Sequence, residues 1–257
     1  MIRYDVADRI GTITIDRPEK RNAMTYAMLA EFIETVGRAG SDDRAHVVIV
    51  TGSGGSFCAG TDLSDLATIP GESRGVRGEA EQADVWWPLV QCPKPVIAAI
   101  DGPAVGMGAE FTSQCDVRIA STRARFAWNF AHRGLVPDTG AGTWLLPRLI
   151  GLPAALRLLY SGEFIDAQQA LDLGYVTKVV EPKALPDEAL AEAQRFLKGS
   201  PLSHRLIKQL AYEGLQRDVT GHMRAHVEAL QTCFRSEDHK EGVAAFLEKR
   251  EAKFVGR

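Results

Sequence analysis

The 257-residue chain has few cysteines, and their arrangement excludes two common uses of the thiol group. The four form no Cys-x-x-Cys pair and have no histidine at a spacing suited to zinc, which argues against a metal site. So few thiols in a chain of this length indicate a reducing compartment and not a disulfide scaffold. We therefore expect a cytoplasmic protein without a bound metal. The cysteines are Cys58, Cys92, Cys115 and Cys233.

Long apolar runs and an excess of charge are also missing. No stretch of about 18 apolar residues occurs, and residues 1–10 lack the apolar segment of a signal peptide. With 30 basic and 33 acidic residues, the formal net charge is -3. The chain as a whole therefore has no electrostatic attraction to nucleic acid or to an anionic membrane, and we expect neither as a partner.

What the sequence does contain is an alternation of strand and helix patterns. Residues 10–16 alternate Ile with Thr, which predicts a half-buried strand, and the short apolar runs 47–50, 96–100 and 117–120 predict buried strands. Apolar residues at helical spacing between 29 and 36 predict an amphipathic helix, and another helix is expected to begin near 106–108. This alternation predicts an α/β fold.

The last third of the chain is different, because only helical patterns occur there. Three helices are predicted around residues 190–197, 223–234 and 243–247. We expect an α/β core over residues 1–195 and a helical region over residues 196–257. Residues 69–78 are polar and rich in glycine, which predicts a mobile surface stretch.

Two loops that follow buried strands are rich in small residues, namely Phe57–Leu63 and Asp101–Glu110. Small residues let a ligand approach the backbone closely, and ligands of α/β folds favour the loops at the carboxyl ends of strands. One exposed N–H group from each loop would suffice to bind a developing oxyanion. Either loop taken alone also fits an ordinary strand-to-helix turn. The pattern Gly106-Met107-Gly108 lacks the third glycine of a dinucleotide-binding fingerprint.

Taken together, these loops and other segments resemble the enoyl-CoA hydratase/isomerase family, also called the crotonase family. The similarity covers nearly the whole chain, with several motifs in the family's order and spacing. The segments that carry it are Arg17–Met24, Phe57–Leu63, Lys94–Gly102, Gly106–Glu110, Cys115–Asp116, Gly134–Asp138 and Glu241–Arg250.

The resemblance implies a spiral of β-β-α units with a C-terminal helical trimerisation region, and a homotrimer or a dimer of trimers. It implies acyl-CoA thioester substrates, so that coenzyme A arrives with the substrate and no separate cofactor is needed. The shared chemical step is stabilisation of a thioester enolate. By position, the oxyanion donors are the backbone N–H groups of Thr61 and Met107.

The resemblance also implies where coenzyme A binds. The family's binding segments correspond here to Arg21, Ala23, Ala59, Gly60, Thr61, Asp62, Leu63 and Gly106. Lys249 is the positional candidate for a lysine that reaches the nucleotide phosphates from a neighbouring subunit. For Arg21 and Lys249 a plain solvated charge is the alternative.

The acid and base groups depart from the family pattern. Glu110 matches one of the two glutamates that family hydratases use, but the second position holds Phe130, which can neither donate nor accept a proton. Asp138 is the next candidate, because related isomerases carry an aspartate there. Its alternative is a helix N-cap, since an apolar helix is expected through Trp144. The alternative for Glu110 is a structural tie to the backbone or to Arg118.

These assignments favour an enoyl-CoA hydratase in which Glu110 is the main acid and base and Asp138 assists it. An enoyl-CoA isomerase that uses Asp138 is the second hypothesis, and a hydrolase or C–C lyase acting on a β-dicarbonyl CoA ester is a weaker third. An RNA-binding role rests only on the basic stretch 118–133 and is opposed by the acidic net charge. His132 is expected to be a surface or core histidine. One additional residue in segment 139–142 predicts a different local backbone.

Overall fold

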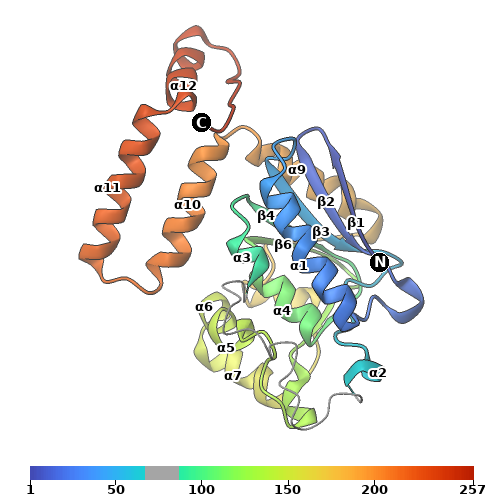
Figure 1. Cartoon of the computed structure of the whole chain (residues 1–257). Helices are drawn as coiled ribbons and strands as arrows, with labels where there is room; N and C mark the ends of the chain where they lie inside the picture. Colours follow the sequence, from blue (N-terminus) through green and yellow to red (C-terminus); the bar gives the residue numbers. More distant parts are fainter. Residues whose placement is uncertain (67–86) are drawn as a thin grey trace.

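The centre of the molecule is a six-stranded sheet in the order β1-β2-β3-β4-β6-β9 (Figure 1). The structure is a computed structural model, and it describes residues 1–66 and 87–257. Strands β1 (Ile2–Ala7) and β2 (Ile10–Ile15) are antiparallel, and all other pairs in this sheet are parallel. The other strands are β3 (Val47–Gly52), β4 (Val96–Ile100), β6 (Val117–Ser121) and β9 (Lys178–Val180).

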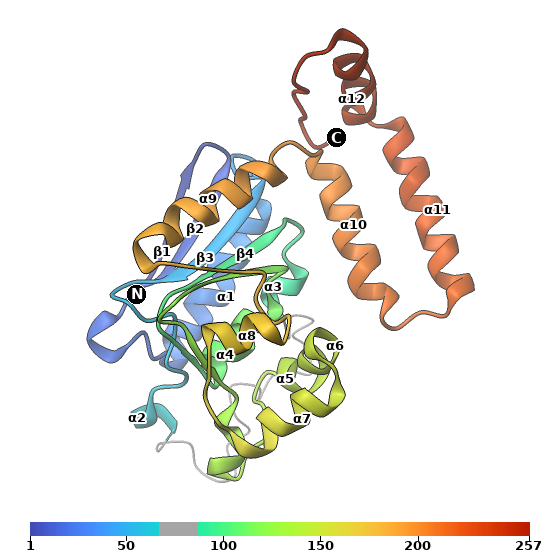
Figure 2. The same ribbon diagram turned by 180° about the vertical axis from the view of Figure 1, so that it is seen from behind.

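Helices cover both faces of this sheet, which explains why its central strands are apolar without interruption. Side chains alternate between faces along a strand, so Val48 and Val50 contact the main core while Val47 and Ile49 contact a second cluster. Helix α1 (Tyr26–Ser41) covers the first face, and α9 (Leu185–Phe196) covers the second (Figures 1 and 2).

A second, smaller sheet joins the short strands β5 (Pro103–Val105), β7 (Arg125–Ala127) and β8 (Ile165–Asp166). The chain therefore runs from a strand of the large sheet into a short strand and then into a helix, as in β4, β5 and α4 (Met107–Gln114). The next unit repeats this order with β6, β7 and the 3-10 helix η2 (Asn129–Arg133). This succession places equivalent loops side by side.

The remaining elements of the core are short. They are η1 (Pro18–Lys20), α2 (Leu63–Leu66), α3 (Pro88–Gln91), α5 (Ala141–Trp144), α6 (Leu146–Ile150), α7 (Leu152–Ser161), α8 (Ala167–Asp172) and η3 (Pro182–Ala184). Among residues 1–66 and 87–257, no helix combines the length and the apolar character needed to cross a bilayer.

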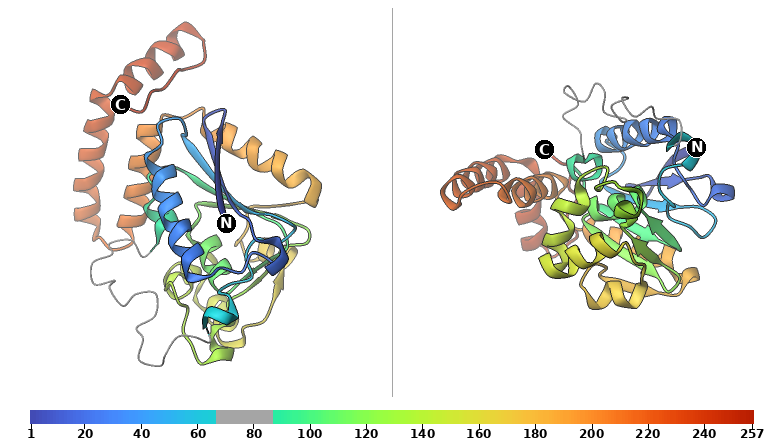
Figure 3. Two further views of the ribbon diagram at one scale, coloured as in Figure 1. Left: turned by 45° about the vertical axis from the view of Figure 1, so that its right-hand side comes forward. Right: turned by 90° about the horizontal axis from the view of Figure 1, so that it is seen from below.

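Beyond α9 the chain forms an arm of three helices, α10 (Pro201–Gly214), α11 (Val219–Arg235) and α12 (Glu237–Glu248), which projects from the core (Figure 3). Helix α10 fastens the arm. The buried Lys208 ammonium lies 2.9 Å from Asp116 Oδ2 and donates to the Leu89 carbonyl, while the Tyr212 hydroxyl donates to Asp116.

The predicted strands and helices correspond to β2, β3, β4, β6, α1, α4, α9, α11 and α12. Strand β1, the second sheet and α10 were not predicted. The alternation of apolar and charged residues in β1 fits a half-buried strand, whereas the strands of the second sheet have too few residues for a periodic pattern. The predicted boundary after residue 195 falls at the last turn of α9. The stretch 69–78, predicted to be mobile, lies outside the described residues.

Candidate active site

The two glycine-containing loops run side by side in parallel. The Cys58 N–H donates to the Pro103 carbonyl at 3.0 Å, and the Val105 N–H donates to the Cys58 carbonyl at 2.9 Å. Cys58 and Ala104 form the bridge between the loops, and Thr61 and Met107 each lie three residues beyond this pair. The equal spacing brings the two predicted oxyanion donors to corresponding places in adjacent chain segments.

A glycine in an unusual conformation precedes each of these two residues. Gly60 has φ +99°, and Gly106, the N-cap of α4, has φ 53° and ψ -119°. Side chains disfavour such backbone angles, and the angles of one residue set the direction of the next N–H. A Cβ on Gly60 would also lie 3.0 Å from the Val105 carbonyl oxygen. The two glycines therefore let the loops approach and orient the N–H groups of Thr61 and Met107.

Neither N–H group is engaged by the part of the fold that the structure describes. The Met24 N–H donates to the Gly60 carbonyl, and the Asp62 N–H donates to the Met24 carbonyl, so the N–H of Thr61 between them points away from Met24. Met107 is the first residue of α4, where an N–H has no partner within the helix. Within residues 1–66 and 87–257, neither N–H donates a hydrogen bond. A pair of such donors can stabilise an oxyanion, and the helix N-terminus favours negative charge.

Glu110 lies in the first turns of α4 and is fully buried. Its Oε2 accepts a hydrogen bond of 2.6 Å from the Thr139 hydroxyl. Burial raises the pKa of Glu110 to about 7 and the Asp138 charge also raises it, whereas the Thr139 hydroxyl and the nearby amides of Gly142 and Ala141 lower it. A carboxyl group with this pKa can both accept and donate a proton near neutral pH. The alternative tie to Arg118 is wrong, because that side chain donates to backbone carbonyls.

Asp138 is not a helix cap. Helix α5 begins at Ala141 with Gly140 as its N-cap, and the Ala141 N–H donates to the Thr139 hydroxyl oxygen. The helix therefore starts two residues further on than the capping interpretation requires. The Asp138 charge raises the pKa of Glu110, and the next residue in the chain, Thr139, donates its hydroxyl to Glu110.

Phe130 occupies the region where a second glutamate was expected. Its side chain is buried, and its ring lies 3.8 Å from where a Cβ of Gly106 would be. Trp128 is also buried and packs edge-on against Tyr175, with ring centroids 5.1 Å apart. No described position near Glu110 supplies a second glutamate, so Asp138 is the neighbouring acidic group.

The segments predicted to bind coenzyme A form a connected layer beside the Thr61 loop. The Arg21 carbonyl accepts a hydrogen bond from the Ala59 N–H, while the Arg21 side chain is exposed. Asp62 accepts 2.7 Å and 3.0 Å hydrogen bonds from Arg17 and the Ser64 N–H, and these hold the pKa of Asp62 below its ordinary value.

The same Arg17 group donates to the Ala23 carbonyl, so one side chain connects the two predicted binding segments. Sequence reasoning missed this role of Arg17, although Arg17 opens the first family segment. Leu63 begins α2 directly after Asp62.

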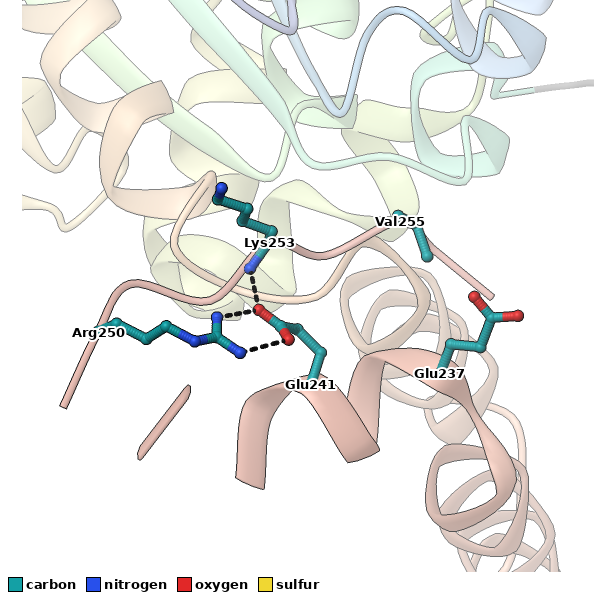
Figure 4. Close-up of a pocket in the computed structure, with 5 residues that line it drawn as sticks. All are labelled: Glu237, Glu241, Arg250, Lys253 and Val255. Atoms are coloured by element: carbon teal, nitrogen blue, oxygen red, sulfur yellow. Dashed lines mark hydrogen bonds and ion pairs between the residues drawn. The ribbon is translucent and has the colours of Figure 1, made fainter. Parts of the chain in front are cut away.

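Lys249 is not brought to Glu110 within one chain. It is exposed, ends α12 in a left-handed conformation and lies on the arm, at the opposite end of the molecule from α5 (Figures 1 and 2). Beside it, Glu241 binds the Arg250 guanidinium through both oxygens and the Lys253 N–H, which folds the C-terminal tail back on α12 (Figure 4).

Two arginines of the basic stretch 118–133 are engaged within the fold. Arg118 is buried and donates to the carbonyls of Thr112, Cys115 and Tyr175. Arg123 is paired with Asp101. His132 is exposed on η2 and has no part in the site. Among the residues that the structure describes, no group of three His, Cys, Asp or Glu side chains is placed to hold a metal ion.

The fold and the site thus define an α/β protein in which the Thr61 loop and the first turns of α4 bring together a buried carboxyl group and two backbone N–H groups that donate no hydrogen bond within the described residues. A sequence model of the enoyl-CoA hydratase/isomerase family matches residues 5–257, and the chain belongs to this family. Its fold is the crotonase fold. The enoyl-CoA hydratase structure from Bacillus anthracis superposes with a TM-score of 0.93 at 33% identity, covering 100% of this chain and 99% of the other.

Two relatives illustrate the range of activities in the family. The chain is 37% identical to a crotonyl-CoA hydratase from Syntrophomonas wolfei, over 97% of this chain and 96% of the relative. It is 34% identical to a 1,2-epoxyphenylacetyl-CoA isomerase from Escherichia coli, over 96% and 95% of the two chains. Hydratases and isomerases are therefore both among its relatives.

Proposed function

We propose that the protein hydrates a trans-2-enoyl-CoA to the 3-hydroxyacyl-CoA. The observation that carries this proposal is the buried Glu110, with a pKa of about 7, on the helix whose first N–H donates no hydrogen bond within the described residues. The similarity to crotonyl-CoA and short-chain-enoyl-CoA hydratases, each 37% identical, supports a short-chain substrate.

In this reaction the thioester oxygen binds between the N–H groups of Thr61 and Met107. Ionised Glu110 takes a proton from water as the water oxygen bonds to Cβ, and the electrons of the double bond move to the thioester oxygen. The two N–H groups stabilise this enolate, each contributing about 3 kcal/mol. Glu110 then returns the proton to Cα, which completes the addition of water and regenerates the carboxylate.

Asp138 assists Glu110 in this proposal, because its charge helps to keep the Glu110 pKa near neutrality. The same carboxylate supports a second candidate, the shift of a double bond from the 3 to the 2 position. Phe130 in place of a second glutamate and the similarity to an isomerase favour this alternative. The two reactions share an enolate and differ in the source and destination of the proton. In hydration the proton comes from water and is delivered to Cα, whereas in the double-bond shift it is removed from Cα and returned to Cγ.

Coenzyme A is proposed to lie along Arg21, Ala23 and the loop from Ala59 to Leu63. Lys249 would reach its phosphates from a neighbouring copy, because within one chain it lies at the far end of the arm. We further propose a trimer or a dimer of trimers, supported by apolar side chains that the arm leaves exposed, such as Met223, Val227 and Phe234. A cytoplasmic location and the lack of a separate cofactor remain predictions from the sequence.

The test is hydration of crotonyl-CoA, which is monitored through the loss of the ultraviolet absorbance of its conjugated thioester. Glu110→Gln is expected to lower kcat roughly a thousand-fold with little change in KM, because the proton-transfer group is lost. Glu163→Gln, at an exposed glutamate that pairs with Arg157, is the matched control and should be unchanged.

Two results would contradict hydration through Glu110. One is a Glu110→Gln enzyme that hydrates at the normal rate. The other is a wild-type enzyme that does not hydrate crotonyl-CoA but converts 3-enoyl-CoA to the 2-enoyl form, with that activity lost in Asp138→Asn. The second result would establish the isomerase alternative.

A further inference from the structure

The two oxygens of Glu110 have different surroundings. Oε2 accepts the 2.6 Å hydrogen bond from the Thr139 hydroxyl. Oε1 is buried and accepts no hydrogen bond of normal geometry within the described part of the chain, although the backbone amides of Gly142 and Ala141 lie close enough to the carboxylate to lower its pKa. A buried carboxyl oxygen without a partner is unfavourable unless something else completes the site.

Thr139 is held in place by hydrogen bonds from the Trp87 indole and the Ala141 backbone N–H. Its carbonyl oxygen accepts a 2.8 Å hydrogen bond from the Trp87 indole N–H. Its hydroxyl oxygen accepts from the Ala141 N–H at 3.3 Å, which leaves the single hydroxyl hydrogen to be donated to Glu110. Because Oε2 receives this hydrogen, a proton carried by Glu110 belongs on Oε1.

The surroundings of Oε1 fit that task. A Cβ on Gly142 would lie 2.3 Å from Oε1 and 3.1 Å from Trp128 Cδ1, so both atoms border the same glycine. The Trp128 Nε1 atom, bonded to that Cδ1, is also buried and has no partner among the described residues. An acceptor and a donor without partners therefore lie around one small residue, as expected where a water or a substrate group binds.

We propose that Thr139 is a positioning residue that anchors Oε2 of Glu110 and thereby reserves Oε1 for proton exchange with water and Cα. The inference rests on the proposed role of Glu110 in hydration and specifies which oxygen acts. It also gives a function to segment 139–142, which supplies the hydroxyl.

The test compares Thr139→Val, which removes the hydroxyl at nearly constant shape, with Thr139→Ser, which keeps it. Thr139→Val is expected to lower kcat about 10- to 100-fold with KM changed less than about three-fold, since a hydrogen bond to a charged group is lost. The hydroxyl lowers the pKa of Glu110, so its removal should also move the low-pH limb of the kcat profile to higher pH. Thr139→Ser should restore both properties.

Thr143→Val is the matched control, because its exposed hydroxyl donates only to the Gly140 carbonyl in the same segment. It should keep the wild-type rate and pH profile. Trp87→Phe removes the N–H that holds the Thr139 carbonyl and provides a second test should Thr139→Val fail to fold. It is expected to lower kcat by a smaller factor, about three- to ten-fold.

A wild-type rate and pH profile in Thr139→Val would overturn the inference, as would a Thr139→Ser enzyme that is no better than Thr139→Val. With the valine variant unfolded, an unchanged kcat in Trp87→Phe would overturn it instead. Glu110→Gln, measured in parallel, distinguishes a failure of the proposed hydration from a failure of the role of Thr139. If that variant is fully active, the proposed function fails. If it is inactive while Thr139→Val is normal, only the role of Thr139 is wrong.

Discussion

Helices α1 and α11 have the same apolar periodicity but opposite environments. In α1 the apolar stripe, including Phe32 and Val36, is buried against the sheet. In α11 the corresponding stripe of Met223, Val227, Leu230 and Phe234 remains 43% to 56% exposed. The pattern therefore establishes an amphipathic helix in both cases, whereas what covers the apolar face depends on the rest of the fold or on another molecule.

The active-site region shows the opposite arrangement, in which a polar group is buried instead of an apolar group being exposed. There a carboxyl group is buried with one oxygen unsatisfied in the described structure, while the arm leaves apolar groups in contact with water. Both arrangements are costly for an isolated chain. We infer that each marks a place where the chain meets something else, namely substrate and water at Glu110 and another copy at α11.

The largest effect is expected from charges placed on the α11 stripe. If the proposed trimer forms through this face, the double variant Val227→Asp/Leu230→Asp should exist as single chains, because desolvating two carboxylates opposes burial of the face. Both positions are exposed in the single chain, so the core should fold normally. Sedimentation equilibrium measures the mass, and Thr232→Asp, at an exposed position outside the stripe, is the control. An unchanged mass in the double variant would show that α11 is not the interface.

Much of the fold could be predicted because its elements carry strong local patterns. The buried strands β3, β4 and β6 are short apolar runs, and α1, α9 and α11 repeat apolar residues at helical spacing. The second sheet could not be predicted in this way, because strands of two or three residues have no period. Their pairing depends on how the large sheet and its loops stack in space.

The candidate site likewise has features that the sequence shows and features that depend on contacts between distant residues. Glycines at 60 and 106 are visible in the sequence, and the pairing of their loops followed from the family resemblance. The bonds of Arg17 to Asp62 and of Thr139 to Glu110 join residues 45 and 29 positions apart, so no local pattern indicates them. The alternative interpretation of Asp138 as a helix cap was wrong for a similar reason. Aspartate is a favourable N-cap residue, but the backbone conformation determines which residue begins the helix.

Adding a side chain beside Glu110 tests whether catalysis depends on the close packing around its carboxyl group. The exposed face of α11 has no such packing. In Gly142→Ala the added Cβ would lie 2.3 Å from Glu110 Oε1, so the carboxyl group must move. We expect kcat to fall about 100-fold, since a displacement of about 1 Å in a catalytic group has an effect of this size.

Crotonyl-CoA hydration measures the change, and Gly37→Ala on α1 is the matched control, because no atom lies within 4 Å of its Cβ position. That variant should retain full activity and gain slightly in stability, since alanine favours a helix over glycine. A Gly142→Ala enzyme with normal kcat would show that Oε1 is not used in the reaction.

The smallest expected effect is on the free energy of unfolding. It should depend on pH at the buried Glu110 and not at the exposed control position. The folded-state pKa of Glu110 is raised from 4.5 to about 7, so the folded chain favours the protonated form, and the stability this gives is lost as pH rises through about 7. Glu110→Gln does not ionise, so its free energy of unfolding relative to wild type should be about 1–3 kcal/mol more favourable at pH 8 than at pH 5. Urea unfolding at fixed protein concentration measures the difference, with Glu163→Gln, on the surface, as the control. Equal offsets at both pH values would mean that burial does not raise the pKa of Glu110, and the contrast between the buried carboxyl group and the exposed arm would then rest on α11 alone.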